Sequence, residues 1–206
     1  MIQNKIQIAI PRARLSFPHL FEKEPLNKYN NLEEARSYVA TFILSKDNEK
    51  HIEVVKNIRE AEKKLLKDIG VKTNPHNLLI CGDNEYDAID DSTEKGKLNK
   101  SKKEYLKNSW LFKAKSKFPV QLQLRGDKVL DIEVDKNPFY AGCYVNVIIT
   151  MTTYSKGISK YLQLVQFAKD GERLSGGGAL KASDHFEDED EDSATAVDDF
   201  NDVDLF

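Results

Sequence analysis

Apolar and polar residues alternate, or apolar residues run together, in a series of short stretches, and this pattern predicts a mainly β protein. Successive side chains of a strand point to opposite faces, so each stretch can give one face to a core and the other to solvent. We expect Pro11 and Pro18 to interrupt the first stretches. The predicted strands are Ile6–Ile10, Arg12–Phe17, Tyr38–Leu44, Leu78–Cys81, Trp110–Phe118, Pro119–Leu124, Val129–Val134, Ala141–Tyr154 and Ile158–Ala168, with the strands that begin at Pro119 and Val129 paired as a hairpin.

One stretch, His51–Ile69, instead has apolar residues at the 3.6-residue period of an α-helix. Ile52, Val55 and Leu65 are among the residues of its apolar side, and Gly70 follows its end. Because Glu side chains are interspersed with Lys on the opposite side, we interpret this helix as a packing element and not as a grip for nucleic acid.

The stretch that begins at Trp110 interleaves cations with aromatic residues. Alternation puts Lys113, Lys115 and Lys117 on one face and the aromatic rings, including Phe118, on the other. A row of lysines along a strand can follow a phosphate backbone, and exposed rings beside it can stack on bases. The alternative is a solvated lysine edge above an aromatic core face. We interpret the lysines as phosphate contacts and expect Trp110 and Phe118 to lie in the core.

Two further segments offer cations and rings to a binding surface. Arg12 and Arg14 share one face of their strand, with Phe17 on the opposite face; the arginines are there either as phosphate contacts or as solvated side chains. The long strand Ala141–Tyr154 and the strand that follows it form a second hairpin. Aromatic residues on strands commonly fill a core, but those beside lysines are also candidates for base stacking. The candidates here are Tyr144, Tyr154, Lys156, Lys160, Tyr161 and Arg173.

The charge of the chain is divided unequally. Residues 184–206 hold eleven Asp and Glu and no Lys or Arg, which leaves residues 1–183 with 31 basic and 23 acidic residues, a net charge of about +8. Like charges at this density repel, and the few apolar residues cannot offset the entropy lost on ordering. We therefore expect a disordered acidic tail at 184–206 after one domain at 1–183.

A basic domain joined to an acidic tail predicts a protein that binds a polyanion and carries a mimic of it. The tail would cover the basic surface when nucleic acid is absent, and it would be free to hold a protein partner when the surface is filled. The alternative is that the tail only keeps the protein soluble. The apolar pair Leu205–Phe206 favours an interaction, because a solubilising tail gains nothing from it.

Composition argues against several other classes of protein. No apolar run approaches the length of a membrane span, and the first residues lack the apolar core of a secretory signal, so we expect a cytoplasmic protein, in the host cell if a phage encodes it. Cys81 and Cys143 would then stay reduced. No Cys and His lie at zinc-ligand spacing, so we expect no metal and no cofactor.

Four stretches resemble a family of single-stranded-DNA-binding proteins of tailed phages. They are Arg14–Phe21, Cys81–Asp83, Tyr140–Asn146 and Val165–Leu174, and the resemblance extends over most of residues 12–186. It implies an OB-fold, binding of single strands without sequence preference, a homodimer and no catalysis. The acidic tail is similar to those of replication single-strand binders, which end on an aromatic residue and recruit replication proteins. The lysine-rich segment Lys95–Lys107 departs from the family pattern.

The sequence thus predicts a non-enzymatic protein of phage replication or recombination that protects single-stranded DNA and recruits replication or recombination proteins through its tail. The expected fold is mainly β, an OB-fold five-stranded β-barrel with one main helix and long loops. The predicted DNA contacts are Arg12, Arg14, Lys113, Lys115, Lys117, Tyr144, Tyr154, Lys156, Lys160, Tyr161 and Arg173, and the predicted partner contacts in the tail are Asp198, Asp199, Phe200, Asp204, Leu205 and Phe206.

Two alternatives stay open at this point. Clustered carboxylates can bind Mg²⁺, so Asp83, Asp87, Asp90 and Asp91 could serve a divalent-metal nuclease, although carboxylates in a polar loop are usually just solvated. The chain could also be an interaction protein whose tail mimics DNA to occupy another protein.

Overall fold

The computed structural model describes residues 4–25, 36–131, 135 and 137–174. Residues 1–176 form one compact unit, and residues 177–206 lie outside the described residues. The expected disorder of the tail and its six predicted partner contacts therefore fall outside that part of the chain. No helix in the described part is long and apolar enough to span a membrane.

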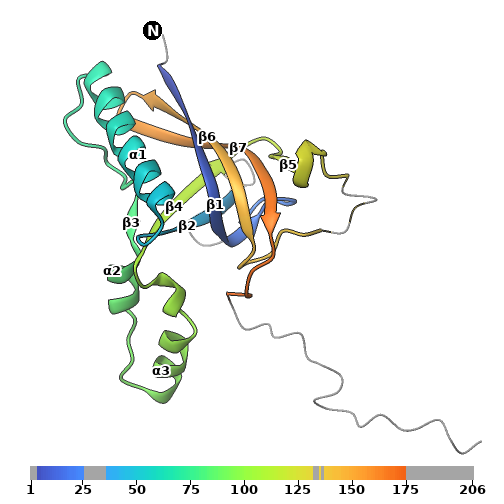
Figure 1. The fold of residues 1–206 in the computed structure, drawn as a ribbon. Coiled ribbons are helices and arrows are strands. Elements are labelled where there is room, and N and C mark those ends of the chain that lie inside the picture. Colours follow the sequence, from blue (N-terminus) through green and yellow to red (C-terminus); the bar gives the residue numbers. More distant parts are fainter. Residues whose placement is uncertain (1–3, 26–35, 132–134, 136, 175–206) are drawn as a thin grey trace, which may run out of the picture. The chain divides into compact units, whose positions relative to one another are not determined.

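Five strands of one sheet pair in a closed ring, which is the arrangement of a small β-barrel (Figure 1). The ring runs β4–β2–β1–β6–β7 and returns from β7 to β4. Its members are β1 (Lys5–His19), β2 (Tyr38–Ser45), β4 (Ser109–Ser116), β6 (Tyr144–Tyr154) and β7 (Gly157–Lys169). The predicted mainly β fold with a five-stranded OB barrel is confirmed. Two short strands, β3 (Ile80–Cys81) and β5 (Gln121–Gln123), extend the sheet at β4 and β7.

β1 is a single bent strand, so the expected interruption at Pro11 is wrong. The register with β6 shifts between Ile10 and Ala13, and Arg12 there has a positive φ of 49°. The amide of Arg12 donates to Oδ1 of Asn146 at 3.0 Å, so a side chain replaces the missing ladder bond. The strand bends at this bulge and continues without ending.

The predicted helix is confirmed as α1 (Glu49–Asp68), whose first turn is capped by the Asn48 side chain accepting from the amide of Lys50 at 3.0 Å. It buries a face that includes Val55, Ile58 and Leu65 against β1, β6 and β7. Ile52, expected on that face, is instead exposed. The helix closes one side of the barrel core.

The segment between β3 and β4 is a helical excursion that stands off the barrel in Figure 1. It contains α2 (Gly82–Asp87), α3 (Glu94–Ser101) and the 3₁₀ turn η2 (Glu104–Leu106). The sequence predicted only a polar surface loop here, because its hydrophobic residues are too few to show a helical period.

The predicted hairpin between Pro119–Leu124 and Val129–Val134 is present at its turn end. Gln123 and Val129 form an antiparallel bridge, the amide of Leu124 donates to the carbonyl oxygen of Lys128 at 2.7 Å, and the amide of Leu130 donates to that of Leu122 at 2.9 Å. Residues 132–134 lie outside the described residues. β5 also pairs with β7 in parallel, and a further 3₁₀ turn, η3 (Arg125–Asp127), follows it. The sequence did not predict the pairing with β7, because that partner lies far along the chain, where no local pattern can indicate it.

Candidate nucleic-acid interface

The outer face of β4 carries a row of exposed lysines. Phe112 and Ala114 are buried in the core, so strand alternation turns Lys113 and Lys115 outward. Neither of these two ammonium groups forms a hydrogen bond or an ion pair with another residue in the described part of the chain. Lys117 follows the strand, and its Nζ donates to a backbone carbonyl oxygen at 3.4 Å. Lys113 and Lys115 thus hold positive charge available to a ligand.

Beside this row, a single residue pair between β4 and β7 closes the barrel. β4 and β7 run parallel and pair at Lys115 and Tyr161, while β3 occupies the same side of β4 further toward its N-terminal end. A cleft of about 550 Å³ lies at this seam. Four of the predicted contact residues line it together, namely Lys113, Lys115, Tyr154 and Lys160.

Lys160 is the partly buried lysine of this cleft. It pairs across the hairpin with Met151, a core residue, so the strand directs its side chain inward. Its Nζ donates to the carbonyl oxygen of Leu78 at 3.3 Å and lies 5.1 Å from the centre of the Phe112 ring. Burial lowers the pKa of Lys160 to about 8, and repulsion from Lys113 and Lys115 acts in the same direction. The negative charge of Glu62 opposes this shift but is outweighed. An ammonium group has three donors, so a bound anion could accept from this one.

The tip of the hairpin between β6 and β7 lies beside the cleft. Tyr154 pairs with Gly157 across the turn, and Lys156 is exposed within it. Tyr161, 43% exposed, sits next to Lys115 on the neighbouring strand. OB-folds bind oligonucleotides on the face of their second and third strands and with the loop between the fourth and fifth. β2, β4 and the turn at Lys156 hold these positions here.

Arg14 and Tyr144 do not line this cleft. They pair across β1 and β6 and line a cavity of about 180 Å³ together with Tyr105 of the excursion. Nη2 of Arg14 donates to the carbonyl oxygen of Glu172 at 2.8 Å, and its Nε is buried with no partner in the described part of the chain. The structure therefore gives Arg14 a role in joining β1 to the chain beyond β7, and its contact with DNA stays a prediction.

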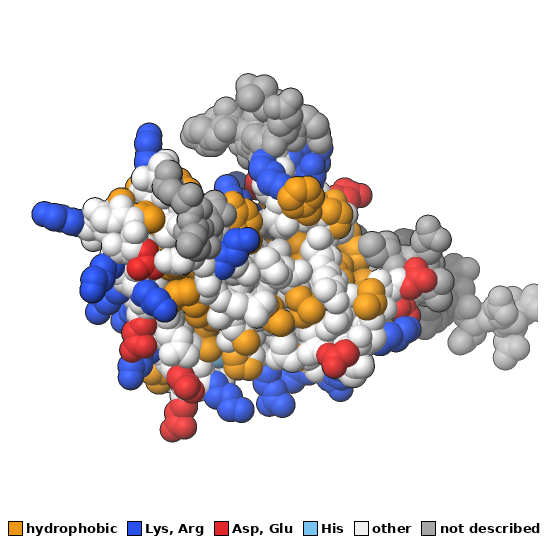
Figure 2. Space-filling model, turned by 90° about the horizontal axis from the view of Figure 1, so that it is seen from above, with side chains coloured by type: hydrophobic (Ala, Val, Ile, Leu, Met, Phe, Trp, Pro, Cys, Tyr) orange, Lys and Arg blue, Asp and Glu red, His pale blue; other side chains and the backbone are white. Residues whose placement is uncertain are grey.

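Arg12 and Arg173 also lie away from the lysine row. Arg12 lines a separate cleft with Asp47 and Glu49, and the guanidinium carbon of Arg173 lies 4.5 Å from the centre of the Tyr140 ring. Figure 2 shows Lys and Arg side chains around the rim of the face it presents, with apolar side chains exposed between them. Because cations are so widely spread, charge alone does not locate the site.

Two phenylalanines, Phe17 and Phe118, are on the surface. Phe17 is 65% exposed and Phe118 is 78% exposed. The expectation that Phe118 lies in the core is wrong, because Phe118 comes after the last residue of β4, where the alternation ends. At Phe17 the alternation fails because the residue has a positive φ of 46°. Each is followed by a proline, Pro18 and Pro119, which is the signal in the sequence that could have indicated the change of direction.

Three of the six lysines of the excursion are neutralised locally. Lys97 binds Glu94, Lys100 binds Asp91 and Lys107 binds Glu104, each with Nζ and a carboxylate oxygen 2.8 Å apart. These ion pairs leave these three lysines less available to phosphate than the row on β4.

Three of the four carboxylates proposed for a nuclease, Asp83, Asp90 and Asp91, accept hydrogen bonds from protein groups. Asp83 accepts from Nζ of Lys46 at 2.5 Å and from the amide of Asn108 at 2.7 Å. The hydrogen bond from Lys46 is the main reason that the pKa of Asp83 is lowered to about 2. Among the described residues, no three His, Cys, Asp or Glu side chains come together as metal ligands. This geometry gives the nuclease alternative no support.

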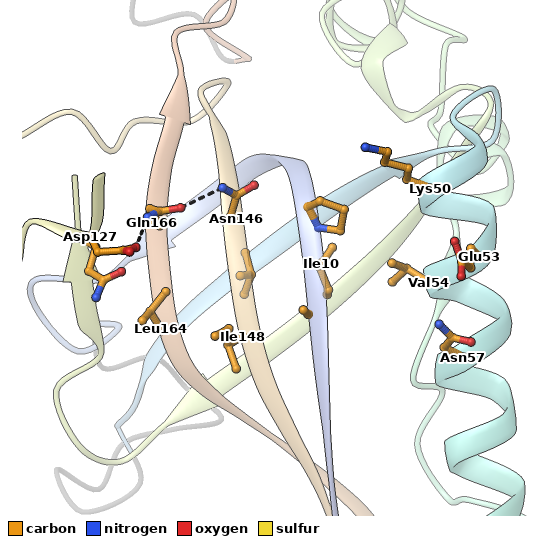
Figure 3. Close-up of a pocket in the computed structure, with 14 residues that line it drawn as sticks. Ile10, Lys50, Glu53, Val54, Asn57, Asp127, Asn146, Ile148, Leu164 and Gln166 are labelled. Carbon is orange, nitrogen blue, oxygen red and sulfur yellow. Dashed lines mark hydrogen bonds between the residues drawn. The ribbon is translucent and has the colours of Figure 1, made fainter. Parts of the chain in front are cut away.

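A larger cleft of about 790 Å³ lies between α1 and the outer face of β1, β6 and β7 (Figure 3). Asn146 donates to Gln166 at 2.9 Å, and Gln166 donates to Asp127 at 2.9 Å, along one rim. Its charged residues are Lys50, Glu53 and Asp127, so the charge is slightly negative. A phosphate backbone would not be attracted to it, and the cationic seam cleft is the better candidate.

A five-stranded OB barrel with a cationic cleft and exposed rings defines a nucleic-acid-binding class of protein. Residues 6–197 match the model of a family described as the Enterobacter phage Enc34 ssDNA-binding protein. A protein designated p50, of Acyrthosiphon pisum secondary endosymbiont phage 1, is 30% identical over 192 residues, which cover 87% of this chain and 92% of that protein. The chain belongs to this family of phage single-stranded-DNA-binding proteins, as its resemblance implied.

Solved structures agree on the fold. The single-stranded-DNA-binding protein of bacteriophage Enc34 in complex with ssDNA superposes with a TM-score of 0.62 and 21% identity, covering 82% of this chain and 89% of that one. A C-terminal truncation of the same protein gives a TM-score of 0.61 and 22% identity, covering 81% and 87%. At these identities the likeness establishes the fold.

Proposed function

We propose that this protein binds single-stranded DNA without reading its sequence, along the outer face of β2 and β4 and at the adjoining seam cleft. The observation that carries the proposal is the unpaired row of Lys113 and Lys115 beside Lys160, on the face where OB-folds hold oligonucleotides. Family membership and the ssDNA complex of the Enc34 protein support the choice of ligand.

The chemistry of this surface fits a strand of any sequence. Lysines that replace counterions on phosphates provide affinity that falls as salt rises. The ring of Tyr161 can stack on a base, and every base has a π-face, so stacking does not select among bases. Single strands are favoured over duplex because their bases are open to the rings.

The biological role follows from this binding mode. A protein that coats single strands protects them during phage replication or recombination, and the acidic tail would recruit replication or recombination proteins through Val197–Phe200 and Val203–Phe206. We further propose a homodimer, the state that the resemblance implies.

Fluorescence anisotropy of a labelled oligo-dT and of a duplex of equal length, each at two salt concentrations, tests the proposal. We expect tighter binding of oligo-dT than of duplex, and a steep loss of affinity as salt rises. Binding of neither ligand at low salt would overturn the proposal and would favour the tail as a mimic that binds another protein.

A further inference from the structure

Phe17 and Phe118 are large apolar side chains placed in water, where they add little to the core. Isolated exposed apolar residues are ordinary on protein surfaces, so exposure alone carries no conclusion. Phe17 and Phe118 differ from such residues because the backbone of each has a fixed conformation that directs the ring into solvent. The aromatic side chains exposed by more than about a third in the described residues are these two and Tyr161.

Phe17 is held outward by an unfavourable backbone conformation. Its φ is 46°, a region that a bulky side chain rarely occupies, and a residue before proline is normally extended. The pairing of β1 with β2 is shifted here, between Ser16 and His19. An extended backbone would restore the alternation and remove the strain. Strain that persists at one exposed position is a common mark of a functional residue.

Phe118 is held by a different device. The hydroxyl of Ser116 donates to the carbonyl oxygen of Phe118 at 2.7 Å and accepts from its amide at 3.1 Å. Ser116 itself is buried at the end of β4, and Pro119 restricts the next residue. The ring of Phe118 is therefore presented from a fixed backbone, although it makes no core contact that needs such fixing.

Both rings belong to the wall that bears the lysine row. Pairing across β1, β2 and β4 aligns Ser16 with Thr41 and Lys113, and His19 with Val39 and Lys115. Phe17 lies between these two rows, about two strand spacings, or roughly 10 Å, from the lysine-bearing strand. Phe118 directly follows Lys117. A strand whose phosphates contact the lysines would thus have one ring beside the row and one ring past its end.

We propose that Phe17 and Phe118 are base-stacking residues, one beside the lysine row and one past its end, and that their Phe-Pro steps are the means by which the barrel presents them. This inference rests on the proposed function, because it assumes that single-stranded DNA lies along the row. It assigns to the two residues a contact with bases, distinct from the phosphate contacts of the lysines.

The variants F17A, F118A and the double variant test the assignment in the full chain. Each single change is expected to weaken oligo-dT binding about tenfold, since removing one stacked base costs on the order of that factor. The dependence of affinity on salt should not change, because the lysines still bind the same number of phosphates. I52A, which removes an exposed apolar side chain from α1, is the matched control and should bind as the wild type does.

An abasic oligonucleotide separates stacking from any indirect effect. The wild type should bind it more weakly than it binds oligo-dT, and the double variant should lose less on it than the wild type does, because only the stacking on Tyr161 is left to lose. If the wild type binds oligo-dT but the alanine variants bind it equally well, the stacking assignment is overturned and the proposed function stands. If the wild type binds no oligonucleotide, the proposed function fails first.

The variant F17G adds a stability measurement, in which we expect no loss relative to F17A although DNA binding is weakened. Glycine adopts a positive φ without steric cost, so this variant removes the ring and relieves the strain together. We expect F17G to melt at or above the temperature of F17A while binding oligo-dT as weakly as F17A does. A melting temperature well below that of F17A would show that the positive φ is not strained at this position, and would overturn the inference that the backbone is held there to present the ring.

Discussion

At the scale of single residues, the charge of Lys160 connects pH to function. Its pKa is lowered to about 8, so near neutral pH the buried ammonium is mostly protonated and at pH 9 mostly neutral. If Lys160 donates to a phosphate, the affinity for oligo-dT should fall between pH 7 and 9 by up to about tenfold. Anisotropy titrations at fixed salt across this range would measure the change.

The variant K160R is the control for that prediction, because arginine stays protonated and its affinity should be nearly constant over the same range. Folding stability should respond with the opposite sign. The folded-state pKa lies below the unfolded value of 10.5, so the unfolded state binds more protons between about pH 8 and 10.5 and this residue makes the fold more stable as pH rises. A wild-type affinity as insensitive to pH as that of K160R would contradict a phosphate contact.

Residue-scale features were predictable from sequence only where a strand is regular. The alternation of side chains along a strand correctly predicted that Lys113 and Lys115 point outward, because β4 is regular in this part. The same rule failed at Phe17, where a positive φ breaks the alternation, and at Phe118, just beyond the strand end. The rule also did not decide whether the Lys160 side chain points inward, because that direction follows from its pairing with Met151.

At the scale of elements, the structure separates two groups of lysines that look alike in sequence. Lys113 and Lys115 on β4 have no carboxylate partner in the described residues, whereas Lys97 on α3 and Lys107 after it are each paired with a neighbouring glutamate. The double variant K113Q/K115Q should therefore weaken oligo-dT binding and reduce the slope of log affinity against log salt by about 1.4, or about 0.7 for each phosphate that is no longer neutralised.

The double variant K97Q/K107Q removes the same net charge and is the matched control. Its carboxylate partners, Glu94 and Glu104, already neutralise these lysines, so both its affinity and its salt slope should stay close to those of the wild type. Equal losses in the two double variants would mean that only the overall charge matters, and the β4 row would not be a site.

Element-scale prediction from sequence succeeded for local patterns and failed for distant pairings. The hydrophobic residues of α1, and those of the hairpin strands β6 and β7, recur at the helical or strand period within one continuous segment, so these elements could be predicted locally. The parallel pairing of β5 with β7, and the single pair that joins β4 to β7, involve residues far apart in the chain. The seam cleft arises from that weak closure, so its four predicted residues could be proposed one by one but not as one site.

At the scale of the whole molecule, the division of charge predicts competition within one chain. The segment Asp184–Phe206 carries eleven negative charges, and the rest of the chain is about +8. At about 0.1 M salt the screening length is roughly 10 Å, so a tethered polyanion near a cationic surface is attracted to it, and the attraction fades as salt increases. Tail and DNA would then compete for the same lysines.

Deleting residues 184–206 should tighten binding of oligo-dT severalfold at low salt and have little effect at about 1 M salt, where the screening length is near 3 Å. A full-length variant with the eleven carboxylates changed to amides should behave as the deletion does, because charge and not length is the cause. Replacing Leu205 and Phe206 with alanine keeps the charge, so it should leave DNA affinity unchanged while weakening capture of a replication partner. If the deletion binds no tighter than the intact chain at any salt, the tail does not compete with DNA, and its acidity serves partner binding or solubility alone.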